Sequence, residues 1–216
     1  MAIPSMHTYE EIISQPTAWD QALEVSAALK GESLRLWHDH SDCGVIFTGC
    51  GSTYYLSLAA AAVYQELTSR GARAVPAGEL VLYPHLHFGT NQSHLLVAIS
   101  RSGTTSETLA AVKRFKAEGR GPVVVITNYG GTPLADLGDL TFSIPAGQEE
   151  SVAQTRSFAS MYVAVVALAA QVAGRDDLLK AMAGLPAAGE RLLKASQPLA
   201  KSIGENLAFD RFYFLG

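Results

Sequence analysis

The sequence predicts an α/β fold, namely a three-layer αβα sandwich with a five-stranded parallel sheet that is preceded by N-terminal helices. Between residues 44 and 144, short apolar runs of strand length alternate with segments of helical pattern. Several of these runs are continuously apolar, which is typical of parallel strands covered on both faces. Two of the runs end in loops rich in glycine and hydroxyl residues, and each loop leads directly into a helix.

Composition narrows the class of protein. The chain has 216 residues, 48% of them hydrophobic and 17% charged, which fits one sizeable globular domain or slightly more. A net charge of −4 gives no basic field, so we expect neither a nucleic-acid nor a membrane partner. The only cysteines, Cys43 and Cys50, are too few for a structural zinc site, and their scarcity suits a reducing, cytoplasmic compartment. We expect no signal peptide at the start of the sequence. The longest apolar run, Met161 to Ala170, is too short to span a bilayer and predicts a buried helix.

Residues 1–40 are predicted to form an N-terminal helical segment. Thr8 and Glu11 have the spacing of a capping box, which predicts that a short helix begins near Thr8. Further helices are expected over residues 16–29 and 32–38, where apolar side chains recur on one face.

The alternating part of the chain follows. Strands are predicted at residues 45–48, 72–76, 95–99, 123–127 and 140–144. Helices are predicted to follow at residues 54–70, 80–83, 109–117, 133–137 and 155–173, and a helical connector at 175–208 holds two more at 176–182 and 187–203. Residues 209–216 end in an apolar run and a glycine, much like residues 45–49, so we expect them to be the first strand of a second copy of the domain.

The loop after the third strand is the strongest candidate for a binding site. Gly103 permits close approach of backbone amides to a ligand, and the helix that follows offers unpaired N–H groups and the positive end of its dipole. These features predict a phosphate site, although a role for Thr105 and Thr108 as simple helix caps is the alternative. The surrounding hydroxyl residues are Ser100, Ser102, Thr104, Thr105, Ser106 and Thr108.

A second loop of the same kind, Gly49 to Thr53, follows the first strand. Because ligands of parallel sheets bind outside the carboxyl ends of the strands, we expect both loops to converge on one crevice. A dinucleotide site is disfavoured, since Tyr54 stands where the third glycine of that fingerprint belongs.

Three motifs together resemble those of sugar isomerase (SIS) domain proteins: TGCGSTYY at 48–55, AISRSGTTSET at 98–108 and QEESVAQTRSF at 148–158. The resemblance covers roughly residues 8–174, with the domain itself at 41–174. The nearest branches look like the galactosamine-6-phosphate deaminase/isomerase (tagatose-6-phosphate ketose/aldose isomerase) group and the isomerase half of glucosamine-6-phosphate synthase. The QTRSF stretch favours the former group.

The resemblance implies a bound sugar phosphate, a homodimer and two such domains in a complete polypeptide, with no cofactor. Carried over by position, Ser100, Arg101, Ser102 and Thr105 hold the phosphate. Gly51, Ser52 and Thr53 line the sugar, and Val152 approaches it through its backbone. Arg101 departs from the glutamine common in the synthase, and it either adds a cation to the phosphate site or points to solvent.

Catalysis of aldose–ketose interconversion needs a base that moves a proton between C1 and C2. In two-domain relatives the base, a histidine and a lysine come from the second domain and the carboxyl tail. Glu149 is therefore the candidate catalytic residue in this chain, because single-domain relatives place a glutamate near this loop. The alternative is that Glu149 and Glu150 form a solvated pair or a charge feature at a helix N-terminus.

We expect no metal site. His85 and His87 are two residues apart, which is poor ligand spacing on a helix, and they flank proline-rich chain that we expect to be exposed.

The resulting prediction is a phosphosugar isomerase or deaminase that acts on a hexose or hexosamine 6-phosphate, with this chain as its N-terminal half. The alternative is a non-catalytic, regulatory SIS module that binds a sugar phosphate. The sequence leaves open which sugar is bound and whether ammonia is released.

Overall fold

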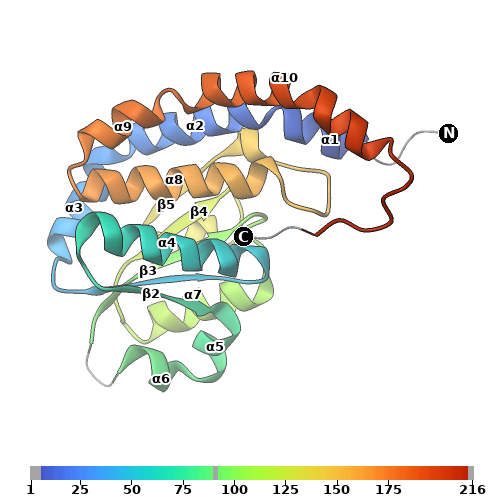
Figure 1. Cartoon of the computed structure of the whole chain (residues 1–216). Coiled ribbons are helices and arrows are strands. Elements are labelled where there is room, and N and C mark those ends of the chain that lie inside the picture. The colour runs from blue at the N-terminus through green and yellow to red at the C-terminus, as the bar shows by residue number, and fades with distance from the viewer. Residues whose placement is uncertain (1–5, 90–91, 214–216) are drawn as a thin grey trace.

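The computed structural model describes residues 6–89 and 92–213 and contains a five-stranded sheet at its centre (Figure 1). The strand order is β2-β1-β3-β4-β5, and every neighbouring pair is parallel. The predicted fold class is confirmed. The strands are β1 (Gly44–Gly49), β2 (Ala72–Pro76), β3 (His94–Ser100), β4 (Val123–Thr127) and β5 (Leu140–Ser143).

Helices cover both faces of the sheet (Figure 1). On one face pack α2 (Gln15–Ala28), α3 (Lys30–Asp39), α4 (Ser52–Thr68) and α8 (Arg156–Val172). On the other face pack α5 (Ala77–Leu82), α6 (Pro84–Phe88), α7 (Ser106–Ala117) and the 3₁₀ turn η1 (Ala135–Leu137).

The strands are buried on both faces because their successive side chains alternate between two cores. Along β1, Phe47 enters the core beneath α4 and α8, and Ile46 enters the core beneath α5 and α7. Every residue of β3 and of β4 is buried. This explains why these strands have continuously apolar sequences rather than alternating ones.

The remaining helices are α1 (Met6–Ile13), α9 (Asp176–Met182) and α10 (Leu185–Gly204), and the 3₁₀ turn η2 (Pro145–Gly147) follows β5, with Gly147 buried beside Asn128 and Ser160. The long helix α10 runs along α2 and α1 at the outer surface (Figure 1). Among the described residues of α10, only Gly189 is buried. It packs against the Trp19 ring of α2.

Two details of the sequence prediction are wrong. Helix α1 already begins at Met6, so Thr8 and Glu11 lie inside the helix and form no capping box at its start. No helix was expected over residues 84–88, which form α6 because Pro84 occupies the first turn, where its missing N–H costs nothing; His85 and Leu86 are exposed as expected, whereas Pro84 and Phe88 are buried.

The predicted strand at the carboxyl end stays a prediction. Residues 205–213 form neither helix nor strand, and residues 214–216 lie outside the described part of the chain.

Candidate functional site

The predicted loops meet at the carboxyl ends of β1 and β3. These strands are neighbours in the sheet, with Thr48 opposite Ala98. The chain leaves β1 for α4 on one face and leaves β3 for α7 on the other face. This reversal makes a topological switch point, which is where ligands of open parallel sheets bind.

The loop from β3 to α7 is held by its own hydroxyl groups. Ser100 Oγ accepts a hydrogen bond from the Gly103 amide at 3.2 Å and lies 3.4 Å from Thr105 Oγ1. Ser102 Oγ accepts from the Thr104 amide at 3.3 Å and from the Thr104 hydroxyl at 3.0 Å. Gly103 has a φ of +64°, and a Cβ there would lie 2.1 Å from Thr132 Oγ1, so the turn requires glycine.

The first turn of α7 is not closed by a threonine cap. Thr105 occupies the N-cap position, but its side chain makes no capping hydrogen bond. Thr108 Oγ1 is buried and has no partner within the described residues. The backbone N–H groups of the first turn are thus left to water or to a ligand.

The loop from β1 to α4 uses its threonine differently. The Thr53 hydroxyl accepts from the Cys50 amide and donates to the Cys50 carbonyl, both at 3.0 Å. Thr53 is buried by this closure, whereas Gly51 and Ser52 are exposed at the start of α4. Gly51, Ser52 and Thr53 therefore lie at the switch point, with only the first two open to a ligand.

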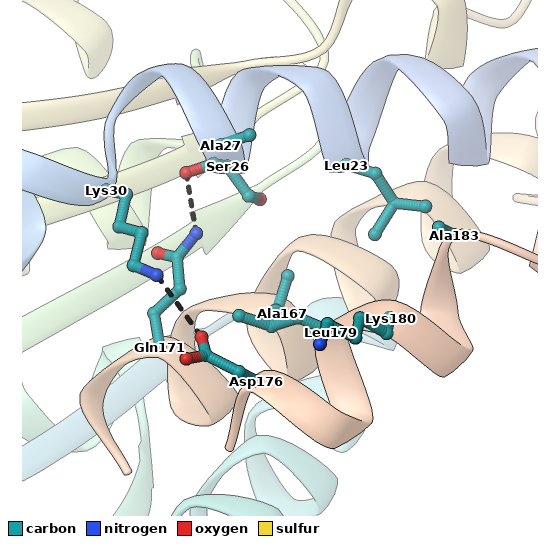
Figure 2. Close-up of a pocket in the computed structure, with 10 residues that line it drawn as sticks. All are labelled: Leu23, Ser26, Ala27, Lys30, Ala167, Gln171, Asp176, Leu179, Lys180 and Ala183. Atoms are coloured by element: carbon teal, nitrogen blue, oxygen red, sulfur yellow. Dashed lines mark hydrogen bonds and ion pairs between the residues drawn. The ribbon is translucent and has the colours of Figure 1, made fainter. Parts of the chain in front are cut away.

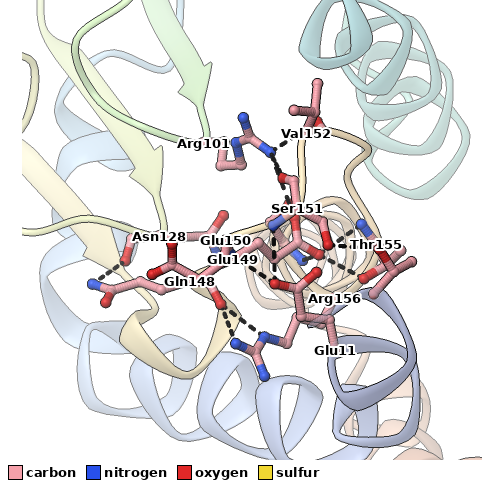
Figure 3. A network of polar contacts seen from close by, with 12 residues as sticks. Glu11, Arg101, Asn128, Gln148, Glu149, Glu150, Ser151, Val152, Thr155 and Arg156 are labelled. Atoms are coloured by element: carbon pink, nitrogen blue, oxygen red, sulfur yellow. Dashed lines mark hydrogen bonds and ion pairs between the residues drawn. The ribbon is translucent and has the colours of Figure 1, made fainter. Parts of the chain in front are cut away.

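The loop of residues 148–155 brings Glu149 to the start of α8 (Figure 3). Its side chain is fully buried. Glu149 Oε1 accepts hydrogen bonds from the Thr155 amide at 2.7 Å, the Thr155 hydroxyl at 2.6 Å and the Ser157 amide at 3.2 Å, and Oε2 accepts from the Ser157 hydroxyl. This is the geometry of a carboxylate that caps a helix and opposes its dipole.

Arg101 connects the loop of residues 100–105 to the loop of residues 148–155 rather than pointing to solvent. Its Nη1 donates to the Ser151 carbonyl at 3.1 Å and to the Val152 carbonyl at 3.2 Å, and lies 3.8 Å from Glu149 Oε2 (Figure 3). Its own carbonyl accepts from the Asn128 amide at 3.2 Å, which fixes the backbone at the end of β4. The Val152 side chain is 94% exposed beside it.

A residue that sequence reasoning did not assign to the site is Glu11 of α1. Glu11 Oε1 accepts from the amides of Glu150 at 2.7 Å and Ser151 at 3.1 Å. Burial acts to raise the pKa of Glu11, but the hydrogen bonds from Ser151 and Glu150 and the charge of Arg156 outweigh it and lower that pKa. The capping-box spacing marked Glu11 as a hydrogen-bonding carboxylate, yet it suggested the wrong partner.

A separate cavity lies away from these loops, between α2, α8 and α9 (Figure 2). Its volume is about 480 Å³. Its wall is mainly aliphatic, and a Lys30–Asp176 ion pair of 3.4 Å stands at one end. No predicted site residue lines it. The lining residues are Leu23, Ser26, Ala27, Lys30, Ala167, Gln171, Asp176, Leu179, Lys180 and Ala183.

The described residues hold neither a metal-binding cluster nor a membrane-spanning helix. No cluster of three or more histidine, cysteine, aspartate or glutamate side chains there is arranged to hold a metal ion. No helix in the same residues is both long and apolar enough to cross a membrane.

Comparison with known proteins identifies the family. Residues 41–171 match the SIS domain, which is more than half of the chain. The chain belongs to the SIS domain family. The resemblance predicted from the three motifs is thus confirmed, and α1 with Glu11 lies before the matched range.

Relatives of this SIS domain include two glutamine–fructose-6-phosphate aminotransferases (isomerizing). The Helicobacter pylori protein is 38% identical over 116 residues, which are 54% of this chain and 19% of that protein. The Haemophilus influenzae protein is 28% identical over 214 residues, which are 93% of this chain and 33% of that protein. The chain therefore spans about a fifth to a third of the length of these curated relatives.

A solved structure with the same fold is the tagatose-6-phosphate ketose/aldose isomerase from Escherichia coli. The TM-score is 0.78 at 22% identity, and the match covers 88% of this chain and 54% of that one. Both branches named from the sequence motifs thus occur among the relatives and structural neighbours of this SIS domain.

Proposed function

We propose that this chain is the N-terminal part of a phosphosugar isomerase or amino-sugar-phosphate deaminase that acts on a hexose or hexosamine 6-phosphate. The observation that carries the proposal is the loop of residues 100–105, where hydroxyl groups surround the uncapped start of α7 at the switch point of the sheet. Relatives named for fructose 6-phosphate and a neighbour named for tagatose 6-phosphate support this class of substrate.

In this proposal the phosphate is held by Ser100, Ser102, Thr105 and the amides of the first turn of α7. Hydrogen bonds from hydroxyl and amide groups suit a small dianion, because they need no net positive charge in the site. Gly51 and Ser52 line the sugar from the β1 side, with buried Thr53 holding their turn closed, and the backbone of Val152 faces it from the loop of residues 148–155.

The proton transfer between C1 and C2 needs a base with a free lone pair near the sugar. Glu149 was the candidate, but its carboxylate oxygens accept four hydrogen bonds from Thr155 and Ser157 and lie near Arg101. We therefore assign Glu149 a positioning role and place the proton-transferring groups in the remainder of a longer polypeptide. The chain of residues 1–216 alone is expected to show no turnover.

A second candidate function is a regulatory SIS module that binds the same ligand without chemistry. The full engagement of the Glu149 carboxylate favours it, since this chain then supplies no base. Assay of the complete polypeptide with fructose 6-phosphate, tagatose 6-phosphate and their amino counterparts separates the two functions. Conversion of any of these supports the enzyme, and inertness towards all of them supports the regulator.

The proposal includes a homodimer in the cytoplasm. Leu192 and Leu199 on α10 are more than 60% exposed, which leaves an apolar surface available for association. Light scattering coupled to gel filtration at micromolar concentration tests the dimer, for which twice the chain mass is expected.

Ligand binding is tested by thermal unfolding of residues 1–216. Fructose 6-phosphate, tagatose 6-phosphate and glucosamine 6-phosphate are expected to raise the melting temperature, because they bind only the folded state. Fructose, tagatose, glucosamine and NAD at the same concentrations are the controls and should leave it unchanged. Equal shifts with the phosphorylated and the plain sugars would contradict the proposed phosphate site.

A further inference from the structure

We propose that Glu11 and Arg101 form a clamp on Ser151 that sets the position of the Val152 backbone, and thereby the affinity for the sugar part of the ligand. This inference rests on the proposed function and deepens it. It makes Glu11 of α1 a positioning residue of a site whose family match begins only at residue 41. The three residues Glu11, Ser151 and Arg101 are called the Ser151 clamp below.

The clamp holds one residue from two sides with opposite charges. The Ser151 amide donates to Glu11 Oε1 at 3.1 Å, and the Ser151 carbonyl accepts from Arg101 Nη1 at 3.1 Å. Figure 3 shows the two side chains reaching the loop from different elements, Arg101 from the end of β3 and Glu11 from α1. A negative group on the N–H and a positive group on the C=O both strengthen the bonds, so the orientation of this stretch of backbone is fixed.

Contacts beside Ser151 extend the clamp in both directions. Glu11 Oε1 also accepts from the Glu150 amide at 2.7 Å, and Arg101 Nη1 also donates to the Val152 carbonyl at 3.2 Å. The Ser151 hydroxyl lies 2.7 Å from that of Thr8, again on α1. Helix α1 is thus attached to the loop at several points, although it lies more than a hundred residues earlier in the chain.

The Arg101 side chain of the clamp has a counter-charge inside the protein. Arg101 Nη1 lies 3.8 Å from Glu149 Oε2, whose side chain is fully buried. Glu11 is only 2% exposed, so its side chain cannot touch a ligand. Arg101 is paired with Glu149, and its Nη1 donates to two backbone carbonyls. We therefore assign Arg101 to holding the loop rather than to neutralising phosphate.

The clamp is expected to affect contacts to the sugar and not those to the phosphate. The backbone of residues 100–105 is held without the Arg101 side chain, by the Ser100–Gly103 hydrogen bond and by bonds from the Asn128 and Leu134 amides to the carbonyls of Arg101 and Gly103. Val152 is 94% exposed, and the bond that its carbonyl accepts comes from the Arg101 side chain of the clamp. Loosening the clamp should therefore weaken contacts to the sugar and leave those to the phosphate intact.

The test measures the dissociation constants of residues 1–216 for fructose 6-phosphate and for inorganic phosphate. In Glu11→Gln and in Arg101→Ala, we expect the constant for fructose 6-phosphate to rise about tenfold and that for inorganic phosphate to change less than twofold. Arg101→Lys keeps one donor and should restore part of the affinity. The matched control is Glu10→Gln, an exposed neighbour on α1.

The double variant Glu11→Gln/Arg101→Ala sharpens the test. Because both side chains hold the same residue, the double variant should lose little more affinity than the stronger single variant. Hydrogen exchange of the amides of residues 150 and 151, measured without any ligand, should be faster in both single variants than in wild type. This second measurement is independent of ligand binding.

Three results would overturn the clamp. The first is an Arg101→Ala variant that loses as much affinity for inorganic phosphate as for fructose 6-phosphate, which would show that Arg101 contacts the phosphate itself. The second is a Glu11→Gln variant that binds fructose 6-phosphate as tightly as wild type, which would show that α1 does not position the site. Unchanged exchange at residues 150 and 151 in both variants would show that neither side chain holds the loop. Failure of the proposed function looks different, because wild type would then bind neither fructose 6-phosphate nor inorganic phosphate.

Discussion

The loops after β1 and β3 have similar sequences but use their hydroxyl groups in different ways. In the β1 loop, the Thr53 hydroxyl both accepts from and donates to Cys50, so it closes the turn. In the β3 loop, Ser102 accepts from Thr104, and Thr105 leaves the start of α7 uncapped. A glycine- and hydroxyl-rich turn can therefore close itself with hydrogen bonds or leave the amides at a helix start uncapped. The variants below test this difference, beginning with the largest expected effect.

The β1 loop is expected to lose stability when a side chain is added at its first glycine, Gly49. In Gly49→Ala the new Cβ would lie 2.7 Å from backbone atoms of Thr53, which cannot move without opening α4. We expect a loss of about 2–3 kcal/mol of unfolding free energy, as for other overpacked sites. Urea denaturation followed by circular dichroism measures it.

The control for this variant is Gly78→Ala, at the start of the helix that follows β2. A Cβ there meets no atom within 4 Å, so the change should be neutral or slightly stabilising, as expected of alanine in a helix. Similar losses in both variants would show that the tight approach of Gly49 to Thr53 does not limit stability.

The Thr53 hydroxyl gives the second prediction. Thr53→Val keeps the shape of the side chain but removes both 3.0 Å hydrogen bonds to Cys50. We expect a loss of about 2 kcal/mol in unfolding free energy, because the polar groups of the turn lose their partner. Thr53→Ser retains the hydroxyl and is the control. A Thr53→Val protein as stable as the Thr53→Ser protein would remove the distinction between the two loops.

Much of the fold could be predicted from the sequence. The strands 72–76 and 123–127 have the predicted bounds, and the long apolar run at 161–170 lies within the buried helix α8. These successes share a cause, since burial on both faces of a parallel sheet demands continuous apolar residues, which are visible in a sequence. The position of the loops at residues 49–53 and 100–105 followed from the same rule.

The polar contacts between distant segments could not be predicted. Glu11 contacts Ser151, 140 residues later, and no local pattern encodes a hydrogen bond between segments so far apart. The direction of Arg101 was left open for the same reason, because it depends on carbonyls of the 148–155 loop. Glu149 illustrates a third limit, since a carboxylate before a helix can serve as a cap or as a base until its partners are known.

The β3 loop gives the third prediction. Ser102→Ala is expected to weaken binding of fructose 6-phosphate by about 1.5 kcal/mol, the scale of a hydrogen bond to a charged group. Its unfolding free energy should change by less than about 0.5 kcal/mol, because the Ser102 hydroxyl accepts only exposed hydrogen bonds from Thr104. Calorimetric titration and urea denaturation measure the two quantities. A variant that loses stability while it keeps its affinity would place the β3 loop in the same class as the β1 loop.

The smallest effect concerns pH and separates both hydroxyl loops from the charged loop of residues 148–155. Hydroxyl groups do not titrate between pH 3 and pH 7, so neither Thr53→Val nor Ser102→Ala should alter the acid sensitivity of the protein.

The folded-state pKa of Glu11 lies below its ordinary value of 4.5, because the hydrogen bonds from Ser151 and Glu150 and the charge of Arg156 outweigh burial. A carboxylate with a lowered pKa adds stability that is present above its ordinary pKa and is lost as the pH falls through the folded value. Glu11→Gln should therefore be less stable than wild type at pH 6, and the difference should shrink as the pH approaches 3. Urea denaturation at pH 6, 5, 4 and 3 measures this trend, with Glu10→Gln as the exposed control. If the difference stays constant over that range, Glu11 holds Ser151 through shape alone and its charge contributes nothing.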